Sequence, residues 1–173
     1  MHKIAGRLMV LSLMVFGFYL AAAHADEEKI GLDKVPKVVI DAVKARFAGA
    51  KLVGADKETD KGKVAYEIAI EHKDQKIEVT VTPEGMIFQI EKLITYKDLP
   101  KVVSEAVESK YPKAKAEKVE EVIKVKDGQE KLEYYELVLG TAQAKTIEVT
   151  VSPQGKILNE EDQSKEKKET KKQ

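Results

Sequence analysis

The stretch Val35-Pro36-Lys37-Val38-Val39-Ile40-Asp41-Ala42-Val43 decides the fold, because a close copy of it returns further along the chain as Leu99-Pro100-Lys101-Val102-Val103-Ser104-Glu105-Ala106-Val107. Downstream, residues 77–81 (IEVTV) are repeated without change at 147–151. An internal repeat of this kind indicates two copies of one structural unit. The offset between the copies is wider downstream than upstream, which places about six extra residues in the second copy, most simply in a longer hairpin around Val122 to Lys131.

Each copy opens with a helix signal. A proline suits the first turn of a helix, where its missing N–H has no intrahelical partner to lose. Apolar residues then recur at helical spacing and form one stripe, which is typical of a helix packed on a sheet. The stripe residues are Val35, Val39, Val43 and Phe47 in the first copy and Leu99, Val103, Val107 and Tyr111 in the second.

The rest of each copy alternates apolar and polar residues, as in Tyr66-Glu67-Ile68, which is typical of a half-buried strand. Turn residues separate these strands by only a few positions, so hairpins are the economical connection. We therefore predict an α+β protein of two tandem modules, each a helix packed on a four-stranded antiparallel sheet. The sequence leaves open whether the two sheets join.

The segment 1–25 reads as a secretory signal peptide. His2, Lys3 and Arg7 precede a 13-residue apolar run that ends near Ala23-His24-Ala25, a cleavage signature. A membrane span needs roughly 20 apolar residues, so we expect cleavage and no stable membrane insertion. The predicted organisation is a signal peptide at 1–25, modules at 26–93 and 94–160, and a disordered charged tail at 161–173, in a periplasmic or secreted protein.

Composition excludes several functions. The leader carries two of the 30 Lys and Arg residues and none of the 30 acidic ones, so the remainder has a formal charge of −2 and no implied basic face for nucleic acid. The chain has no cysteine, which excludes disulfides and thiolate metal sites. After the leader its one histidine is His72, in a predicted turn, which is too little for a zinc or nucleophile site. We predict no cofactor and no enzyme activity.

The order of these motifs resembles the PepSY-like family, also described as beta-lactamase-inhibitor-like. The resemblance lies in Leu-Pro or Val-Pro before the helix, an aromatic residue at its end, a Tyr-Glu strand and a closing Pro-x-Gly turn, in both copies. It implies exported tandem modules that bind or inhibit other proteins. Family members often have an acidic residue where this chain has Thr82 and Ser152, and the inhibitor archetype has disulfides, so no inhibitory contact residue is carried over.

Two kinds of candidate residue lie on the predicted sheet face away from the helices. Glu67, Glu78, Glu136 and Glu148 are carboxylates that alternate with inward apolar residues, and a solvated sheet face is the simplest interpretation of them. Phe88, Ile90, Tyr134 and Val138 are apolar or aromatic on the same predicted face, where they either contact a partner or, for Phe88 and Ile90, seal the junction between modules.

These residues are compatible with two predicted functions. The first is a protein-binding or peptide-binding module that uses the open sheet face, with Tyr134, Phe88, Ile90, Val138, Glu67 and Glu136 as contacts. The alternative is a module for a small ligand or a divalent cation, held by outward carboxylates. No loop with alternating Asp or Asn at calcium-ligand spacing supports the alternative, and we assign no metal ligands.

Overall fold

The computed structural model describes residues 26–163, which form nine strands and two α-helices. The helices are α1 (Lys37–Arg46) and α2 (Lys101–Lys110), each preceded by a 3-10 turn, η1 (Leu32–Lys34) and η2 (Tyr96–Asp98). The strands are β1 (Asp26–Ile30), β2 (Lys51–Asp60), β3 (Lys63–His72), β4 (Gln75–Val81), β5 (Ile87–Leu93), β6 (Lys115–Lys126), β7 (Gln129–Gly140), β8 (Thr146–Val151) and β9 (Ile157–Asp162).

All nine strands belong to one antiparallel sheet in the order β1 to β9. The prediction of an α+β protein built from two helix-on-four-strand modules is therefore wrong: the described chain is mostly β, with two short helices. The physical reason lies at β5 and β6, which pair from Gln89↔Lys124 to Leu93↔Glu120. Two separate sheets would each leave an unpaired edge there, and this pairing satisfies both edges.

Strand β1 adds the ninth strand and was not predicted. It pairs with β2 from Asp26↔Thr59 to Ile30↔Ala55. Four of its five residues are charged, so it lacks the apolar alternation by which strands are recognised in a sequence. Backbone pairing with β2 and the packing of its last residue, Ile30, against the first apolar cluster account for its position.

The helices form where the repeat predicts them, and both cover the same face of the sheet. Each begins directly after its proline, Pro36 or Pro100. The predicted stripes pack into two apolar clusters, one under each helix. In the first cluster Val39 and Val43 have no exposed surface and meet Ile68 and Val79 of the sheet.

The β6–β7 hairpin ties the two halves together. It carries the extra residues of the second copy and turns at Asp127 and Gly128. Ile123 belongs to the first apolar cluster, under α1, and Val125 packs against it. At the tip, the Arg46 Nε of α1 donates a hydrogen bond to Glu130 Oε1 at 3.0 Å. The insertion in the second copy thus packs on the helix of the first.

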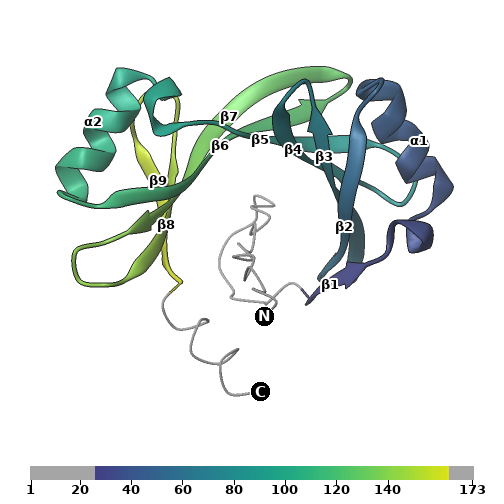
Figure 1. The fold of residues 1–173 in the computed structure, drawn as a ribbon, viewed down its shortest axis with the longest axis horizontal. Coiled ribbons are helices and arrows are strands. Elements are labelled where there is room, and N and C mark those ends of the chain that lie inside the picture. The colour runs from purple at the N-terminus through teal and green to yellow at the C-terminus, as the bar shows by residue number, and fades with distance from the viewer. Residues whose placement is uncertain (1–25, 164–173) are drawn as a thin grey trace, which may run out of the picture.

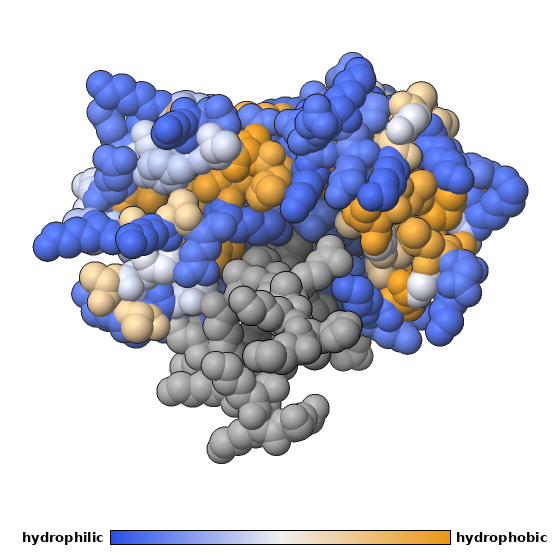
Figure 2. Space-filling model, in the orientation of Figure 1, coloured by the Kyte–Doolittle hydropathy of each residue, from blue (hydrophilic) through white to orange (hydrophobic). Residues whose placement is uncertain are grey.

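The sheet bends into an arch with both helices on its outer side, α1 over one half and α2 over the other (Figure 1). Hydrophobic colour shows at two separate places, one in each half, between hydrophilic side chains (Figure 2). The two places agree with the two apolar clusters. Among the described residues, no helix has the length and apolar character needed to cross a membrane.

Two predicted segments fall wholly or mainly outside the described residues. The signal peptide at 1–25 lies outside them, and so do residues 164–173 of the predicted tail. The first residues of that tail, Glu161 and Asp162, instead complete β9, where they pair with Glu148 and Ile147. The division of the chain at residues 93 and 94 stays a prediction.

Candidate functional site

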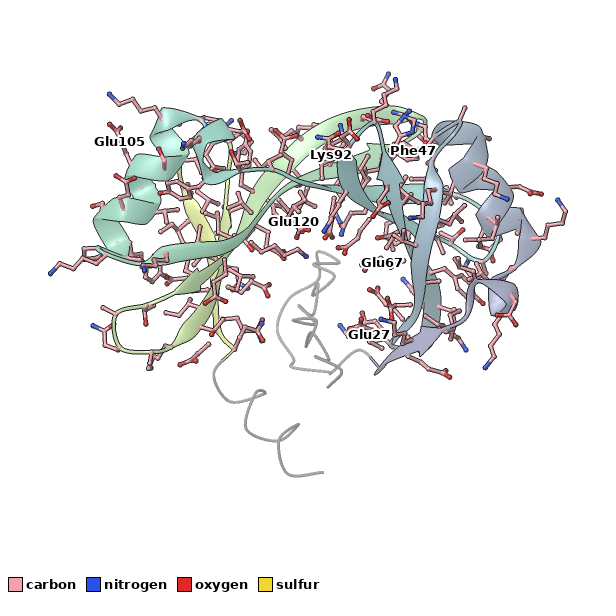
Figure 3. All side chains as sticks on the ribbon, viewed as in Figure 1. Glu27, Phe47, Glu67, Lys92, Glu105 and Glu120 are labelled. Atoms are coloured by element: carbon pink, nitrogen blue, oxygen red, sulfur yellow. The ribbon has the colours of Figure 1, made fainter. Side chains whose placement is uncertain are left out.

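Nine glutamates, one from each strand, lie on the sheet face that the helices leave uncovered. We call this set the acidic row, and it comprises Glu27, Glu58, Glu67, Glu78, Glu91, Glu120, Glu136, Glu148 and Glu161. Figure 3 shows Glu27, Glu67 and Glu120 on the inner side of the arch, whereas Phe47 and Glu105 lie on the helix side. The inner face of the arch therefore carries a line of carboxylates from one edge strand to the other.

The strand register places these glutamates on one face. Four pairs are direct cross-strand neighbours: Glu27↔Glu58, Glu78↔Glu91, Glu120↔Glu136 and Glu148↔Glu161. The remaining steps run through a residue two positions away on the same strand, and therefore on the same face. Glu67 faces Thr80, two residues from Glu78, and Glu136 faces Thr150, two residues from Glu148. Directly opposed like charges destabilise a sheet, so this arrangement needs compensation.

The centre of the acidic row is its most crowded part. One carboxylate oxygen from each of Glu78, Glu91 and Glu120 lies within 4.8 Å of the others. Lys118 supplies positive charge, since its Nζ is 2.8 Å from Glu120 Oε1 and 3.6 Å from Glu78 Oε2. Gln89 Nε2 donates a hydrogen bond to Glu91 Oε1 at 2.5 Å. Two of the three carboxylates therefore contact one ammonium group, and the third accepts a hydrogen bond from Gln89.

Further oxygens of the row have no hydrogen-bond donor. Glu58 Oε2, Glu120 Oε2 and Glu136 Oε1 are buried and unpaired. A buried carboxylate oxygen without a donor is costly while the group is ionised. The carboxylates of the inner face therefore have fewer hydrogen-bond donors and positive charges around them than full ionisation would require.

The electrostatic consequence is a set of raised carboxyl pKa values. Burial, followed by the charges of Glu27 and Glu91, raises the pKa of Glu58 to about 7. Burial and the neighbouring carboxylates also raise the pKa of Glu67 and of Glu136. For Lys118, burial disfavours the charged form, but Glu120 and Glu78 outweigh it and raise the pKa. Protons are therefore held on this face at a pH where ordinary carboxyls have lost them.

The structure places two of the predicted contact residues within the acidic row. Glu67 and Glu136 lie on the face away from the helices, as predicted, together with Glu78 and Glu148. The simple interpretation of a solvated face is wrong for Glu136 and Glu148, which are buried. Their role in contacting a partner stays a prediction.

Of the predicted apolar contact residues, three are buried in the structure. Tyr134 and Val138 lie on the inner face, opposite Val122 and Lys118, but are only 4% and 3% exposed, so neither is the open anchor that was expected. Ile90 was placed on the wrong face: it pairs with Val79 and packs in the cluster under α1. Phe88 is half-buried and lies where the register between β4 and β5 shifts, between the paired residues Ile87 and Gln89. Strict alternation along β5 does not allow for this extra residue, and it therefore assigned Ile90 to the wrong face.

Sequence reasoning missed five members of the acidic row. Glu27, Glu58, Glu91, Glu120 and Glu161 were not singled out, because the sequence left open whether the two sheets join and gave no register for the strands that carry them. A signal was present in the charge pattern of the paired strands. On β5, Glu91 comes two residues after Gln89, and on β6, Glu120 comes two residues after Lys118, so each pair shares one face of its strand. Pairing of β5 with β6 brings the four residues together.

Comparisons with known proteins show what this architecture resembles. Neither a protein-family model nor a curated protein matches the sequence. Solved structures do match. A protein from Bacteroides eggerthii named a "putative periplasmic protein" superposes with a TM-score of 0.61 at 17% identity, over 76% of this chain and 91% of its own.

Two further structures agree with it. A DUF2874 family protein from Bacteroides uniformis gives a TM-score of 0.61 at 16% identity, covering 73% of this chain and 88% of its own. A BLIP-like protein from Bacteroides fragilis gives 0.57 at 18% identity, covering 74% and 86%. This chain has their fold. At such low identity the likeness is one of fold alone.

Proposed function

We propose that this protein is an exported, non-enzymatic binding module whose inner sheet face receives a positively charged protein or peptide segment. The acidic row is the observation that carries the proposal. Complementary potentials attract and orient a charged partner, and nine glutamates along one face make a surface complementary to a run of Lys or Arg. The partner's charges would supply the compensation that the row lacks.

Export is supported by two observations. The segment 1–25 has the composition of a secretory leader. The fold is shared with proteins named as periplasmic and as BLIP-like. These names describe those proteins, and we propose for this chain a periplasmic module that binds another protein.

The chemistry of the acidic face supports a partner-binding role over catalysis. Its charged groups are carboxylates and lysines spread along an arch. The one described histidine, His72, lies at the end of β3 with its ring 5.8 Å from that of Phe47, on the helix side. A carboxylate face with raised pKa values would release protons as cationic side chains bind, so affinity should rise between pH 6 and pH 8.

A binding assay with a matched control tests the proposal. A fluorescent oligolysine peptide is titrated with the purified protein, with a Glu67→Gln/Glu148→Gln variant and with a Glu105→Gln/Glu108→Gln variant. Both variants lose the same formal charge, but the second loses it on α2, away from the acidic row. If each of the two carboxylates makes an ion pair with the peptide worth about 0.5 kcal/mol, the inner-face variant should bind about fivefold more weakly.

Equal affinities for the two variants would contradict the proposal, since binding would then follow net charge and not the inner face. Neither variant may unfold at a lower temperature than the unaltered protein, which excludes loss of fold as the cause of weaker binding.

A further inference from the structure

Gln163, the last residue that the structure describes, contacts one end of the acidic row. Its backbone N–H donates a hydrogen bond to the Thr146 carbonyl oxygen at 2.9 Å. Its side-chain Nε2 donates another to Glu148 Oε2 at 3.0 Å, and the residue is half-buried. Strand β9, which ends just before it, is the last strand of the sheet and lies at one end of the arch (Figure 1). The chain therefore leaves the sheet beside a member of the row.

The ten residues that follow, 164–173, have a positive charge, and we call them the lysine-rich segment. They include five lysines and two glutamates, a formal charge of +3. Residues 26–163 have the opposite balance, with 23 Lys and Arg residues and 28 acidic ones. Because complementary potentials attract, the lysine-rich segment is suited to the face at which it begins.

The lysine-rich segment is long enough to cross most of the row. Neighbouring strands lie about 4.8 Å apart, so Glu67 on β3, five strands from Glu148 on β8, is about 24 Å away along the sheet. Ten residues in an extended conformation span up to about 33–36 Å. The segment can therefore pass Glu136 and Glu120 and reach Glu67.

The first carboxylates along this route lack hydrogen-bond donors. Glu136 and Glu120 follow Glu148 in the row, and each has one buried oxygen without a hydrogen-bond partner. A nearby ammonium group favours the ionised form of a carboxyl. Lysines of the segment would therefore stabilise the two carboxylates that lie closest to its starting point.

We propose that the lysine-rich segment lies across the acidic row of its own chain, from Glu148 toward Glu67, where a cationic partner must displace it. A short tether holds a segment at an effective concentration in the millimolar range, so weak contacts are sufficient for it to occupy the face. The contact itself needs no partner, whereas its inhibitory effect rests on the proposed function. The segment restricts the face to partners that bind it more strongly than the segment does.

A spin label tests the contact directly. The chain has no cysteine, so Thr170→Cys gives one attachment point for a nitroxide in the ¹⁵N-labelled protein, residues 26–173. The amide resonances of Glu120 and Glu136 should broaden far more than that of Glu105 on α2, and a diamagnetic label is the control. High salt screens charges and should remove the difference. Equal broadening at Glu120 and Glu105, or broadening that salt does not change, would overturn the proposal.

A matched pair of variants tests the competition. Lys168→Gln/Lys171→Gln and Lys37→Gln/Lys44→Gln lose the same charge, the first in the lysine-rich segment and the second on α1. A segment held at about four times its Kd weakens oligolysine binding about fivefold. The first variant loses two of the five lysines and should therefore bind oligolysine about threefold more tightly than the second; equal affinities would overturn the proposal.

Failure of the proposed function gives a different result. Oligolysine would then bind none of the proteins, while salt-sensitive broadening at Glu120 would still support the contact of the segment with the row. Conversely, oligolysine binding on the inner face with equal affinities for the two lysine variants would support the proposed function and contradict the role of the segment.

Discussion

At the scale of single residues, the inner face is defined by glutamates at positions where a sheet usually presents isolated charges to water. Glu136 and Glu148 are buried, and Glu136 keeps one oxygen without a donor. Such groups lower stability once they ionise, because the folded state holds their protons more tightly than the unfolded chain does. The acidic row thus links the stability of the fold to pH.

The pH dependence has a definite sign. The pKa of Glu58 is raised from its ordinary value near 4.5 to about 7, so its favourable contribution is fully present below pH 4.5 and is lost as the pH rises through 7. We expect the free energy of unfolding to fall between pH 5 and pH 8, with Glu58 contributing up to about 3 kcal/mol. Urea unfolding across this range measures it.

The control is a comparison of slopes. Glu58→Gln should flatten the dependence of unfolding free energy on pH, whereas Glu105→Gln, on the exposed surface of α2, should not. Identical slopes for the unaltered protein and Glu58→Gln would show that Glu58 does not titrate differently in the folded state.

Two glycines in equivalent turns make a second residue-scale prediction. Gly155 has φ +80°, and a Cβ there would lie 2.5 Å from the Val102 carbonyl oxygen at the start of α2. Gly85 has φ +89° and approaches Val38 of α1 in the same way. The repeated Pro-x-Gly turn is thus explained by close packing of each turn on its helix.

Gly155→Ala should therefore destabilise the protein more than Gly128→Ala. Gly128 also has a positive φ, +75°, but a Cβ there would meet nothing within 4 Å. Both variants bear the cost of the left-handed conformation, about 1–2 kcal/mol, and only Gly155→Ala adds a backbone collision. Melting temperatures of the two variants give the comparison, and equal losses would contradict the packing argument.

At this scale the sequence predicts part of the site. Alternation around Tyr66 and Ile77 was sufficient to place Glu67 and Glu78 away from the helices. The same alternation failed at Ile90, because the β4–β5 register shifts between Thr80 and Val81. A one-residue shift exchanges the two faces of a strand. No residue type in this stretch of the sequence indicates that the register shifts there.

At the scale of elements, the β6–β7 hairpin is the feature that joins the two copies. Its extra length allows Ile123 and Val125 to cover the apolar cluster under α1, although both residues belong to the second copy. The length difference was readable from the change in repeat offset. The contact of the hairpin with the first apolar cluster could not be predicted, because it depends on the pairing of β5 with β6, a long-range interaction that local sequence patterns do not encode.

The hairpin should therefore stabilise the first copy as well as the second. Ile123 is 8% exposed, and Ile123→Ala removes packed methyl groups at a cost of about 2–4 kcal/mol. We expect a single unfolding transition that moves as a whole, followed by fluorescence and by far-UV circular dichroism. Val53→Ala, at an exposed position on β2, is the control. Two separated transitions in Ile123→Ala would contradict the joining role of the hairpin.

Helices and turns were predicted well for a physical reason. Proline before an apolar stripe is a local signal, and so are the turn residues between strands, of which Lys61-Gly62 and Lys73-Asp74 adopt positive φ in the observed hairpins. Strand β1 lacked any such signal. Its charged sequence is held in place by backbone hydrogen bonds to β2, which an alternating pattern does not reveal.

At the scale of the whole molecule, the two sequence copies form one continuous sheet, and their glutamates therefore form one acidic surface. Each copy alone would offer about half of the acidic row, and the most crowded cluster, Glu78 with Glu91 and Glu120, exists only because β5 meets β6. The duplicated sequence therefore creates at its junction a cluster of carboxylates that neither copy contains. The sequence did not reveal this cluster, because it left open whether the two sheets join.

Mapping a cationic ligand by NMR tests the central claim most directly. Amide resonances of the ¹⁵N-labelled protein are followed while unlabelled oligolysine peptide is added at low salt. Binding on the inner face predicts shifts that concentrate in β3 to β8 around Glu67, Glu91, Glu120 and Glu136 and leave α1 and α2 almost unchanged. Shifts that concentrate on the helices, or that spread evenly over the surface, would contradict a binding role for the acidic row.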